Sequence, residues 1–290
     1  MKWILLTILT VIWGSSFVLI KEGLLTFSPI EVAGLRMIFA SSVLLPFIFR
    51  SVAKIPAGKW KWLLASGMVG NCIPAVLFTL AESRINSTTA GMLNALSPLF
   101  TLLIAFAVFK NKTRSNQWLG VLIGMLGALA LIYFQPKGDK FIADPYAWYV
   151  VLACVGYGAS VNIIRNHFGG LSVMHAAGFA LSFAAIPYVI YFLIHPVAHK
   201  ISFEGTGLRS LLAVAALGMV GSSVATVLFN SLVKKSSALF AASVTYLMPF
   251  VSVVLGIWYG EIVNMAQLIS LALILGGVYI ISRKPKEQAR

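Results

Sequence analysis

Long apolar stretches, separated by short segments rich in charged residues, turn residues and proline, run along the whole chain. Each stretch holds about 20 mainly apolar residues, the length that an α-helix needs to cross the hydrocarbon core of a bilayer. The pattern predicts ten membrane-spanning helices, at residues 3–20, 30–49, 62–81, 87–109, 117–134, 146–164, 173–194, 210–233, 238–259 and 262–282. Only short loops are left between them, so a functional site is expected inside the helix bundle.

Composition leads to the same class of protein. Of the 290 residues, 59% are hydrophobic and 10% are charged, and the mean hydropathy is +0.92. Soluble domains are about 45–50% apolar and about 25% charged, so a water-soluble globule is excluded and an all-α integral membrane protein is predicted. Cys72 and Cys154 both lie within apolar stretches, where their positions indicate neither a disulfide framework nor a metal site.

The basic residues decide the expected orientation of the chain. Its net charge is +14, and its Lys and Arg residues cluster between the apolar stretches. With a cytoplasmic N-terminus, fifteen of them fall on the inner side and six on the outer side, while Arg36 lies within a span. The positive-inside rule therefore predicts a multi-pass protein of the plasma or inner membrane with both termini in the cytoplasm. We attribute the basic excess to topology and to affinity for the lipid bilayer, and expect no nucleic-acid partner.

Two blocks of sequence recur in order. Gly67-Met68-Val69-Gly70 returns as Gly218-Met219-Val220-Gly221, and at the same offset of 151 residues Pro98 matches Pro249. An earlier block, at an offset of 144, pairs Gly14 with Gly158, Ser16 with Ser160 and Ser28 with Ser172. The matches predict two five-helix halves, at residues 1–140 and 141–290. Because each half has an odd number of spans, the second enters the membrane inverted, which favours alternating-access transport.

Several short motifs, taken together, resemble one family. They are Trp13-Gly14-Ser15-Ser16-Phe17, Ser28-Pro29 with Arg36, Leu96-Ser97-Pro98, Leu247-Met248-Pro249, Gly260-Glu261 and Gly276-Gly277. Over nearly its whole length the chain resembles the drug/metabolite transporter (DMT) superfamily, specifically EamA-type ten-span permeases. The resemblance implies a multi-pass carrier of small metabolites, often amino acids or drugs that are moved outward. The glutamate that the family often carries after the fourth span is replaced by Lys110-Asn111-Lys112, so Glu261 has no counterpart in the first half.

Proline marks equivalent positions in the fourth and ninth spans. It lacks an N–H group, so Pro98 frees the backbone carbonyl of Asn94, and Pro249 frees that of Thr245. Freed polar backbone at membrane depth needs a neighbouring group or a water-filled cavity. The prolines therefore indicate either structural kinks or a binding site, and the two interpretations are compatible.

Other polar or amphipathic side chains fall at the same depth. A polar group that faces lipid is unfavourable, so they are expected to face the interior, where hydrogen bonds between helices are the structural alternative to a site. We predict a central substrate-binding cavity formed by Trp13, Ser16, Asn71, Asn94, Pro98, Tyr157, Asn162, Ser222, Thr245, Tyr246 and Pro249.

Arg36 is the one basic residue well within a predicted span. A buried charge needs a partner, so the favoured interpretation is a gate or ion pair with Glu31, Glu22 or Glu82, and contact with a substrate carboxylate is the alternative. No Asp or Glu falls at a bilayer midpoint. Coupling to protons through Glu31 or Glu82, facilitated diffusion and exchange therefore all stay open.

Taken together, these features predict a transporter of small molecules and not an enzyme. The spans offer no nucleophile with a base, no paired acids and no metal ligands, so no catalytic residue, metal or cofactor is expected. Phosphorylated substrates would require several basic residues, and only Arg36 is available. We favour export of amino acids or related zwitterionic or neutral compounds. Efflux of drugs or other cationic compounds is the alternative within carriers, and a solute channel is the alternative of another class. The sequence carries no signal for a particular oligomeric state.

Overall fold

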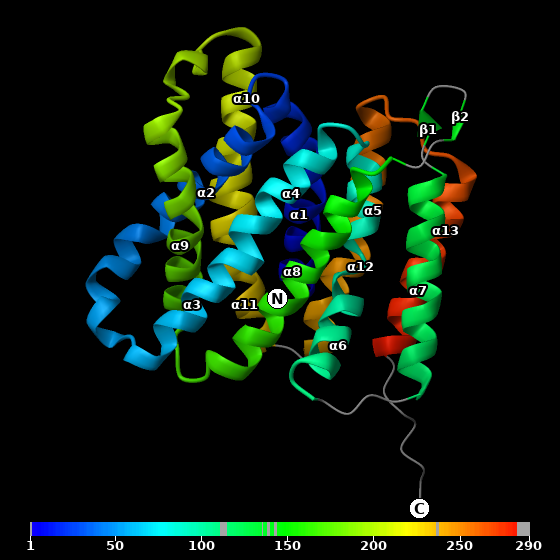
Figure 1. Ribbon diagram of the computed structural model, residues 1–290, viewed down its shortest axis with the longest axis horizontal. Coiled ribbons are helices and arrows are strands. Elements are labelled where there is room, and N and C mark those ends of the chain that lie inside the picture. Colours follow the sequence, from blue (N-terminus) through cyan, green and yellow to red (C-terminus); the bar gives the residue numbers. More distant parts are fainter. Residues whose placement is uncertain are drawn as a thin grey trace, which may run out of the picture.

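The computed structural model describes residues 2–110, 115–134, 136–137, 140–141, 144–235 and 238–282 as a bundle of helices (Figure 1). The helices of the first half are α1 (Lys2–Leu24), α2 (Pro29–Ile48), α3 (Trp60–Gly67), η3 (Met68–Cys72), α4 (Ile73–Glu82), α5 (Ser87–Asn94), α6 (Ser97–Ala107) and α7 (Ser115–Tyr133). A hairpin of two short strands follows, β1 (Pro136–Lys137) and β2 (Lys140–Phe141).

The second half continues with helices of similar length. They are α8 (Ala147–His167), α9 (Val173–Ile194), α10 (Gly205–Ala216), η5 (Leu217–Val224), α11 (Ala225–Lys235), α12 (Ala238–Trp258) and α13 (Met265–Ser282). Short 3₁₀ turns are formed by η1 (Phe49–Lys54), η2 (Ala57–Lys59) and η4 (Ala198–Lys200).

The helices are those of a membrane protein. In the described part of the chain, nine helical segments are long and apolar enough to cross a bilayer, and a shorter apolar helix covers Val244–Trp258. The all-α membrane fold with about ten spans is therefore confirmed. The ends of the spans differ from the predicted ones: α1 continues to Leu24, and the eighth span begins at Gly205, which has a positive φ.

One end of the bundle carries the β1–β2 hairpin, at the top of Figure 1. We call it the hairpin end. The alternation of spans brings the ends of α1, α4, α9 and α12 and the starts of α2, α5, α10 and α13 to this same end. Four glutamates of these helix ends and loops, Glu22, Glu31, Glu82 and Glu261, therefore lie at one side of the predicted membrane.

Two spans contain a π-helical segment at equivalent places. In the third span it is η3, which begins after Gly67, and in the eighth it is η5, which contains the recurring Gly218-Met219-Val220-Gly221. A π-helical turn widens the helix and changes the hydrogen bonds of its backbone, and such turns often occur at functional sites. The repeated motif is therefore a local distortion in both spans.

The two equivalent prolines have different effects. The fourth span breaks into α5 and α6 at residues 95–96, just before Pro98, whereas α12 runs without interruption through Pro249. At the break, the hydroxyl of Ser97 donates a hydrogen bond of 2.8 Å to the carbonyl of Asn94. The side chain thus replaces the backbone donor that Pro98 lacks.

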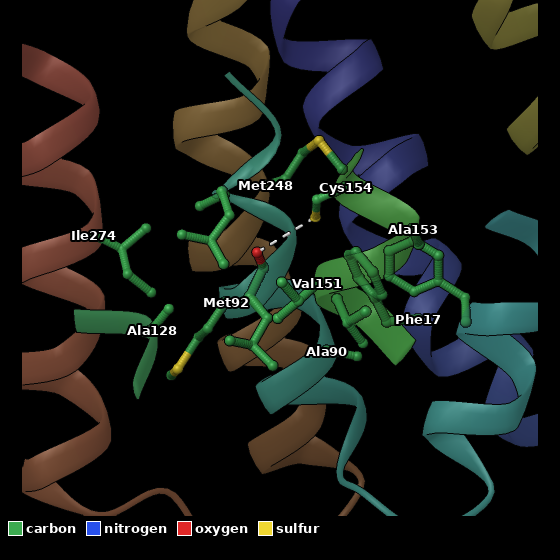
Figure 2. Packing of buried hydrophobic residues seen from close by; sticks show 14 of the residues in the cluster. Phe17, Ala90, Met92, Ala128, Val151, Ala153, Cys154, Met248 and Ile274 are labelled. Atoms are coloured by element: carbon green, nitrogen blue, oxygen red, sulfur yellow. Dashed lines mark hydrogen bonds between the residues drawn. The ribbon is translucent and has the colours of Figure 1, made fainter. Parts of the chain in front are cut away.

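The core surrounds α5 and α8, as Figure 2 shows. Phe17 of α1 and Met248 of α12 pack against this centre, and Cys154 points its thiol at the carbonyl of Leu93, 3.7 Å away. The small side chains of Ala90 on α5 and Ala153 on α8 allow α5 and α8 to approach each other closely. Cys154 is therefore a buried packing residue.

Contacts of glycines match between the two halves. A Cβ atom on Gly218 would lie 2.6 Å from the carbonyl oxygen of Arg36, and one on Gly67 would collide with the carbonyl of Ala180. The two glycines are 151 residues apart, and Arg36 and Ala180 are 144 apart, which are the offsets of the two recurring blocks. The backbones of the second and third spans of opposite halves therefore meet in the same way twice.

Glycines also hold α7 against α13, the pair at the right edge of Figure 1. A Cβ on Gly277 would lie 2.5 Å from the carbonyl oxygen of Gly120 and 2.6 Å from the nitrogen of Gly124, whereas one on Gly276 would have no neighbour within 4 Å. The two adjacent glycines of α13 thus differ completely in their surroundings.

We predict that Gly277→Ala lowers the free energy of unfolding by about 1–3 kcal/mol, because the backbones of α7 and α13 must separate. Gly276→Ala is the matched control, and alanine there raises helix propensity by up to about 1 kcal/mol. Thermal unfolding of the detergent-purified variants tests this. Equal effects of the two substitutions would contradict the described packing.

Candidate substrate-binding site

The π-helical segment η5 is the point at which α1 and α2 meet the second half. The indole nitrogen of Trp13 donates a hydrogen bond of 2.9 Å to the carbonyl of Gly221, and Nε of Arg36 donates one of 3.1 Å to the hydroxyl of Ser222. Ser16 also faces this segment, since its hydroxyl would lie 3.2 Å from a Cβ on Gly221. We call Trp13, Ser16, Arg36 and Ser222 the η5 cluster. All four were predicted from the sequence as site or gate residues.

Arg36 is half-buried in α2 and has neighbours on several helices. Besides Ser222, it interacts electrostatically with Tyr157 on α8, Tyr188 on α9 and Glu82 at the end of α4. Its guanidinium group is therefore within electrostatic range of elements from both halves of the chain. Within the described residues, its two terminal nitrogens donate no hydrogen bond, and no carboxylate lies in ion-pair contact with it.

The structure gives Glu22 and Glu31 other partners. Arg209 donates a hydrogen bond of 2.7 Å from Nη2 to Oε1 of Glu22, and Nζ of Lys200 lies 2.9 Å from Oε1 of Glu31. Glu31 also caps α2, because the backbone N–H of Ser28 donates to it over 2.8 Å. The expected pairing of Arg36 with Glu22 or Glu31 is therefore not formed. Both acids lie at the hairpin end, where Arg209 and Lys200 of the second half form ion pairs with them.

Glu82 differs from these acids. Its side chain is fully buried, and in the described part of the chain neither carboxylate oxygen has a hydrogen-bond partner. Lys21, Arg36 and Glu261 act on it electrostatically without forming a contact pair. Because Glu82 lies at the end of the third predicted span, it was expected near the outer gate, and the sequence did not reveal that its side chain is buried.

Aromatic rings extend from the η5 cluster. Trp13 packs against Phe229 with ring centroids 5.2 Å apart, and Phe78 packs against both Phe17 and Tyr157, each at 5.9 Å. Trp13 and Tyr157, equivalent at the offset of 144, are both half-buried. Both were predicted as apolar walls of a site.

The other π-helical segment, η3, also carries polar groups. Tyr188 donates a hydrogen bond of 2.7 Å to the carbonyl of Cys72, just as Trp13 donates to Gly221 in η5. Asn71, the equivalent of Ser222, is half-buried, and its side-chain amide forms no hydrogen bond among the described residues. Each distorted segment thus accepts one hydrogen bond from an aromatic side chain and carries one polar side chain.

Three of the remaining predicted residues, Asn94, Asn162 and Tyr246, form hydrogen bonds with groups outside the η5 cluster. The amide of Asn162 donates to the carbonyls of Thr101 at 2.9 Å and Gly158 at 2.8 Å, and the hydroxyl of Tyr246 bonds to Ser282 at the end of α13. The carbonyl of Asn94 is closed by Ser97, and its side-chain oxygen also accepts from that hydroxyl. Pro98 begins α6, while Thr245 and Pro249 lie on α12.

Glu261 has a role that sequence reasoning did not identify. Its Oε1 accepts hydrogen bonds from the backbone N–H and hydroxyl of Ser87, at 2.7 and 2.8 Å, and its Oε2 accepts from the same two groups of Thr88, at 2.9 and 2.5 Å. A carboxylate at a helix N-terminus satisfies free N–H groups and complements the helix dipole. Glu261 therefore caps α5 from the loop before α13, and the Gly260-Glu261 motif alone could not indicate a partner 174 residues away.

Metal ligands do not gather in the described part of the chain. No three His, Cys, Asp or Glu side chains lie close enough there to hold a metal ion.

The chain is similar to known membrane transporters along its whole length. Residues 1–133 and 145–283 match the EamA-like transporter family. The "Uncharacterized inner membrane transporter YedA" of Escherichia coli K12 is 28% identical over 288 residues, covering 94% of this chain and 88% of that protein.

Two further relatives have more specific names. The "Probable amino-acid metabolite efflux pump" of Salmonella typhimurium is 24% identical, covering 94% of this chain and 92% of that protein. The "Probable terminal-alkyne amino-acid exporter" of Streptantibioticus cattleyicolor is 25% identical, covering 97% and 92%. A solved structure described as "Crystal structure of protein" superposes with a TM-score of 0.64 at 20% identity, over 96% of this chain and 95% of that one, and shares the fold.

We predict that Glu261→Ala lowers the free energy of unfolding by about 2 kcal/mol, because hydrogen bonds to a charged group are lost and the N-terminus of α5 is left uncapped. Glu261→Gln keeps one accepting oxygen and is expected to have a smaller effect. Glu204→Ala removes an exposed glutamate of the same end and serves as the control. Unfolding of all three variants at the wild-type temperature would contradict the capping role.

Proposed function

The chain belongs to the EamA-like transporter family, and from this premise we propose that it exports amino acids or related zwitterionic or neutral metabolites. It is a multi-pass membrane protein. The direction and the substrate class are supported by the two relatives that are named as exporters of amino acids or their metabolites. The route that we propose is alternating access through a central site between two inverted five-helix halves, at residues 1–140 and 141–290.

Arg36 is the observation that carries this proposal. A guanidinium group inside a helix bundle requires an anion, and a carboxylate fits its two terminal nitrogens. Two of the three acids expected to supply that anion, Glu22 and Glu31, are engaged by Arg209 and Lys200. We therefore assign the substrate carboxylate to Arg36, in preference to the structural ion pair that the sequence favoured.

The rest of the proposed site follows from the η5 cluster. Trp13 and Tyr157 would give it apolar walls, and Ser16, Asn71 and Ser222 would orient polar groups of the substrate. Asn94, Asn162 and Tyr246 are satisfied by local or interhelical hydrogen bonds. We propose that these three stabilise the helices around the site.

The matched glycine contacts support the inverted repeat, since one five-helix unit used twice would place Gly67 on Ala180 and Gly218 on Arg36. The pairs Glu22–Arg209 and Glu31–Lys200 join the two halves at the hairpin end. They would have to separate for that end to open, so we propose them as an outer gate. With the termini in the cytoplasm, the hairpin end faces outward.

A carrier of cationic compounds is the second candidate. The observation that favours it is Glu82, a buried carboxylate without a hydrogen-bond partner in the described residues. A cationic substrate would need this acid and would have no use for Arg36. The two candidates therefore differ in which charged side chain binds substrate.

Counterflow in proteoliposomes separates these candidates. In this assay, unlabelled substrate inside the vesicles accelerates uptake of labelled substrate, which identifies a carrier and excludes a channel. We predict counterflow with amino acids and a loss of about tenfold or more with the corresponding amino-acid amides, which lack the carboxylate. The loss corresponds to about 1.4 kcal/mol, within the range for a hydrogen bond to a charged group.

Arg36→Gln is expected to remove this preference for the free carboxylate. Arg84→Gln is the matched control, because Arg84 is exposed and rests on Tyr146. A variant Arg36→Gln that still prefers acids over amides would contradict the assignment. Flux at channel rates without acceleration by internal substrate would contradict the carrier itself.

Trp13 and Asn162 test which predicted residues belong to the site. Trp13→Ala is expected to lower counterflow about tenfold, because it removes a wall of the site and leaves the carbonyl of Gly221 without its donor. Asn162→Ala is expected to lower the unfolding temperature, because the carbonyl of Thr101 loses its donor, while the Michaelis constant stays near that of the wild type. A raised Michaelis constant in Asn162→Ala together with unchanged counterflow in Trp13→Ala would instead assign Asn162 to the site and exclude Trp13 from it.

A further inference from the structure

Among the described acids of the hairpin end, Glu82 is the one whose carboxyl group is neither exposed to solvent nor bonded to another side chain or backbone group. Glu22 and Glu31 form ion pairs, Glu261 accepts four hydrogen bonds, and Glu204 is exposed. Glu82 has a side-chain exposure of 0%, and both of its oxygens lack hydrogen-bond donors. An ionised carboxylate in such surroundings is strongly disfavoured, and a neutral carboxyl group is not.

The charged groups around Glu82 are placed at a distance. Lys21 on α1, Arg36 on α2 and Glu261 in the loop before α13 act on it electrostatically. The helices α5 and α8 and the segment η3 also pack against α4, and their described residues contribute no charged group that acts on Glu82. Glu261 itself is held by the N-terminus of α5. None of the three forms a hydrogen bond or an ion pair with Glu82.

Arg36 and Glu82 together make an incomplete pair. Each lacks a charged contact partner, they feel each other's field, and yet they form no ion pair within 4.0 Å. A guanidinium and a carboxyl group that both lack a charged contact partner suit a molecule that carries both opposite charges. An amino acid can place its carboxylate on Arg36 and its ammonium group on Glu82, so that each buried charge gains a partner.

We infer that Glu82 binds the ammonium group of a zwitterionic substrate and, when the site is empty, a proton in its place. The inference rests on the proposed transport function and names its substrate class and coupling. Among the described residues the carboxyl group of Glu82 has no hydrogen-bond partner. When a zwitterion binds, the proton leaves Glu82 and the ammonium group takes its position. One proton and one substrate therefore exclude each other, and the carrier moves them in opposite directions.

Proton-driven accumulation in proteoliposomes tests the exchange. With the membrane potential clamped at zero, a pH difference of about one unit should sustain a substrate gradient of about tenfold in the wild type, as one-for-one exchange requires. In Glu82→Gln counterflow should be weaker, because the ammonium group loses its partner, and the pH-driven gradient should collapse to about onefold. Glu204→Gln, an exposed glutamate of the same end, should behave as the wild type. A gradient that persists in Glu82→Gln would overturn the inference, as would net accumulation of substrate by the wild type without proton movement in the opposite direction.

Substrate preference gives a second test on the same variants. A 2-hydroxy acid keeps the carboxylate and lacks the ammonium group, so the wild type should prefer the amino acid by about tenfold or more, and Glu82→Gln should lose that preference. A preference that is unchanged in Glu82→Gln would overturn the assignment of the ammonium group.

Infrared spectroscopy of the purified protein without substrate tests the proton site independently of transport. The wild type and Glu204→Gln should show the carbonyl band of a protonated carboxyl group at neutral pH, and Glu82→Gln should lack it. Absence of the band in the wild type would overturn the inference even if transport is observed. If the band is present but no amino acid is carried, the proposed substrate class fails while the proton site stands.

Discussion

A polar group inside a membrane protein must find its partner within the protein, because the hydrocarbon around it offers none. This constraint explains most of the polar contacts described above. Glu22, Glu31 and Glu261 are each matched to groups from the other half of the chain, at 2.7 to 2.9 Å for the contacts of Arg209, Lys200 and the N–H groups of α5. The exceptions, Arg36 and Glu82, are therefore informative. They are the charges inside the bundle for which the described residues provide no charged contact partner.

The distorted segments η3 and η5 show how the fold positions this site. Their glycines permit close approach of the neighbouring helices, and their altered backbone hydrogen bonding is accompanied by carbonyls that accept from Tyr188 and Trp13. In η5 the hydroxyl of the next residue, Ser222, also accepts a hydrogen bond from Nε of Arg36. The segment η5 thus both allows the neighbouring helices to pack closely and positions the guanidinium group of Arg36. The first and second halves use it at equivalent positions but with different side chains, Asn71 and Ser222, so the proposed site is asymmetric.

Local sequence predicted the spans, because these depend on hydropathy and helix length, and it singled out Trp13, Ser16 and Ser222 as site residues and Arg36 as a gate residue. Contacts between distant residues were out of its reach. Glu261 caps Ser87 across 174 residues, and Lys200 reaches Glu31 across 169. Burial of Glu82 also depends on how neighbouring helices end, which no pattern within α4 specifies. The contact pairs expected between Arg36 and Glu22 or Glu31 are therefore not formed, whereas the alternative of a substrate carboxylate stays a prediction.

The central claim is that a zwitterion binds between Arg36 and Glu82 and displaces a proton. Calorimetric titration of the purified protein with an amino acid, in two buffers of different ionisation enthalpy, measures the protons released on binding. The account predicts about one proton released per substrate bound to the wild type near neutral pH, and none for Glu82→Gln. Binding to the wild type without proton release would contradict it.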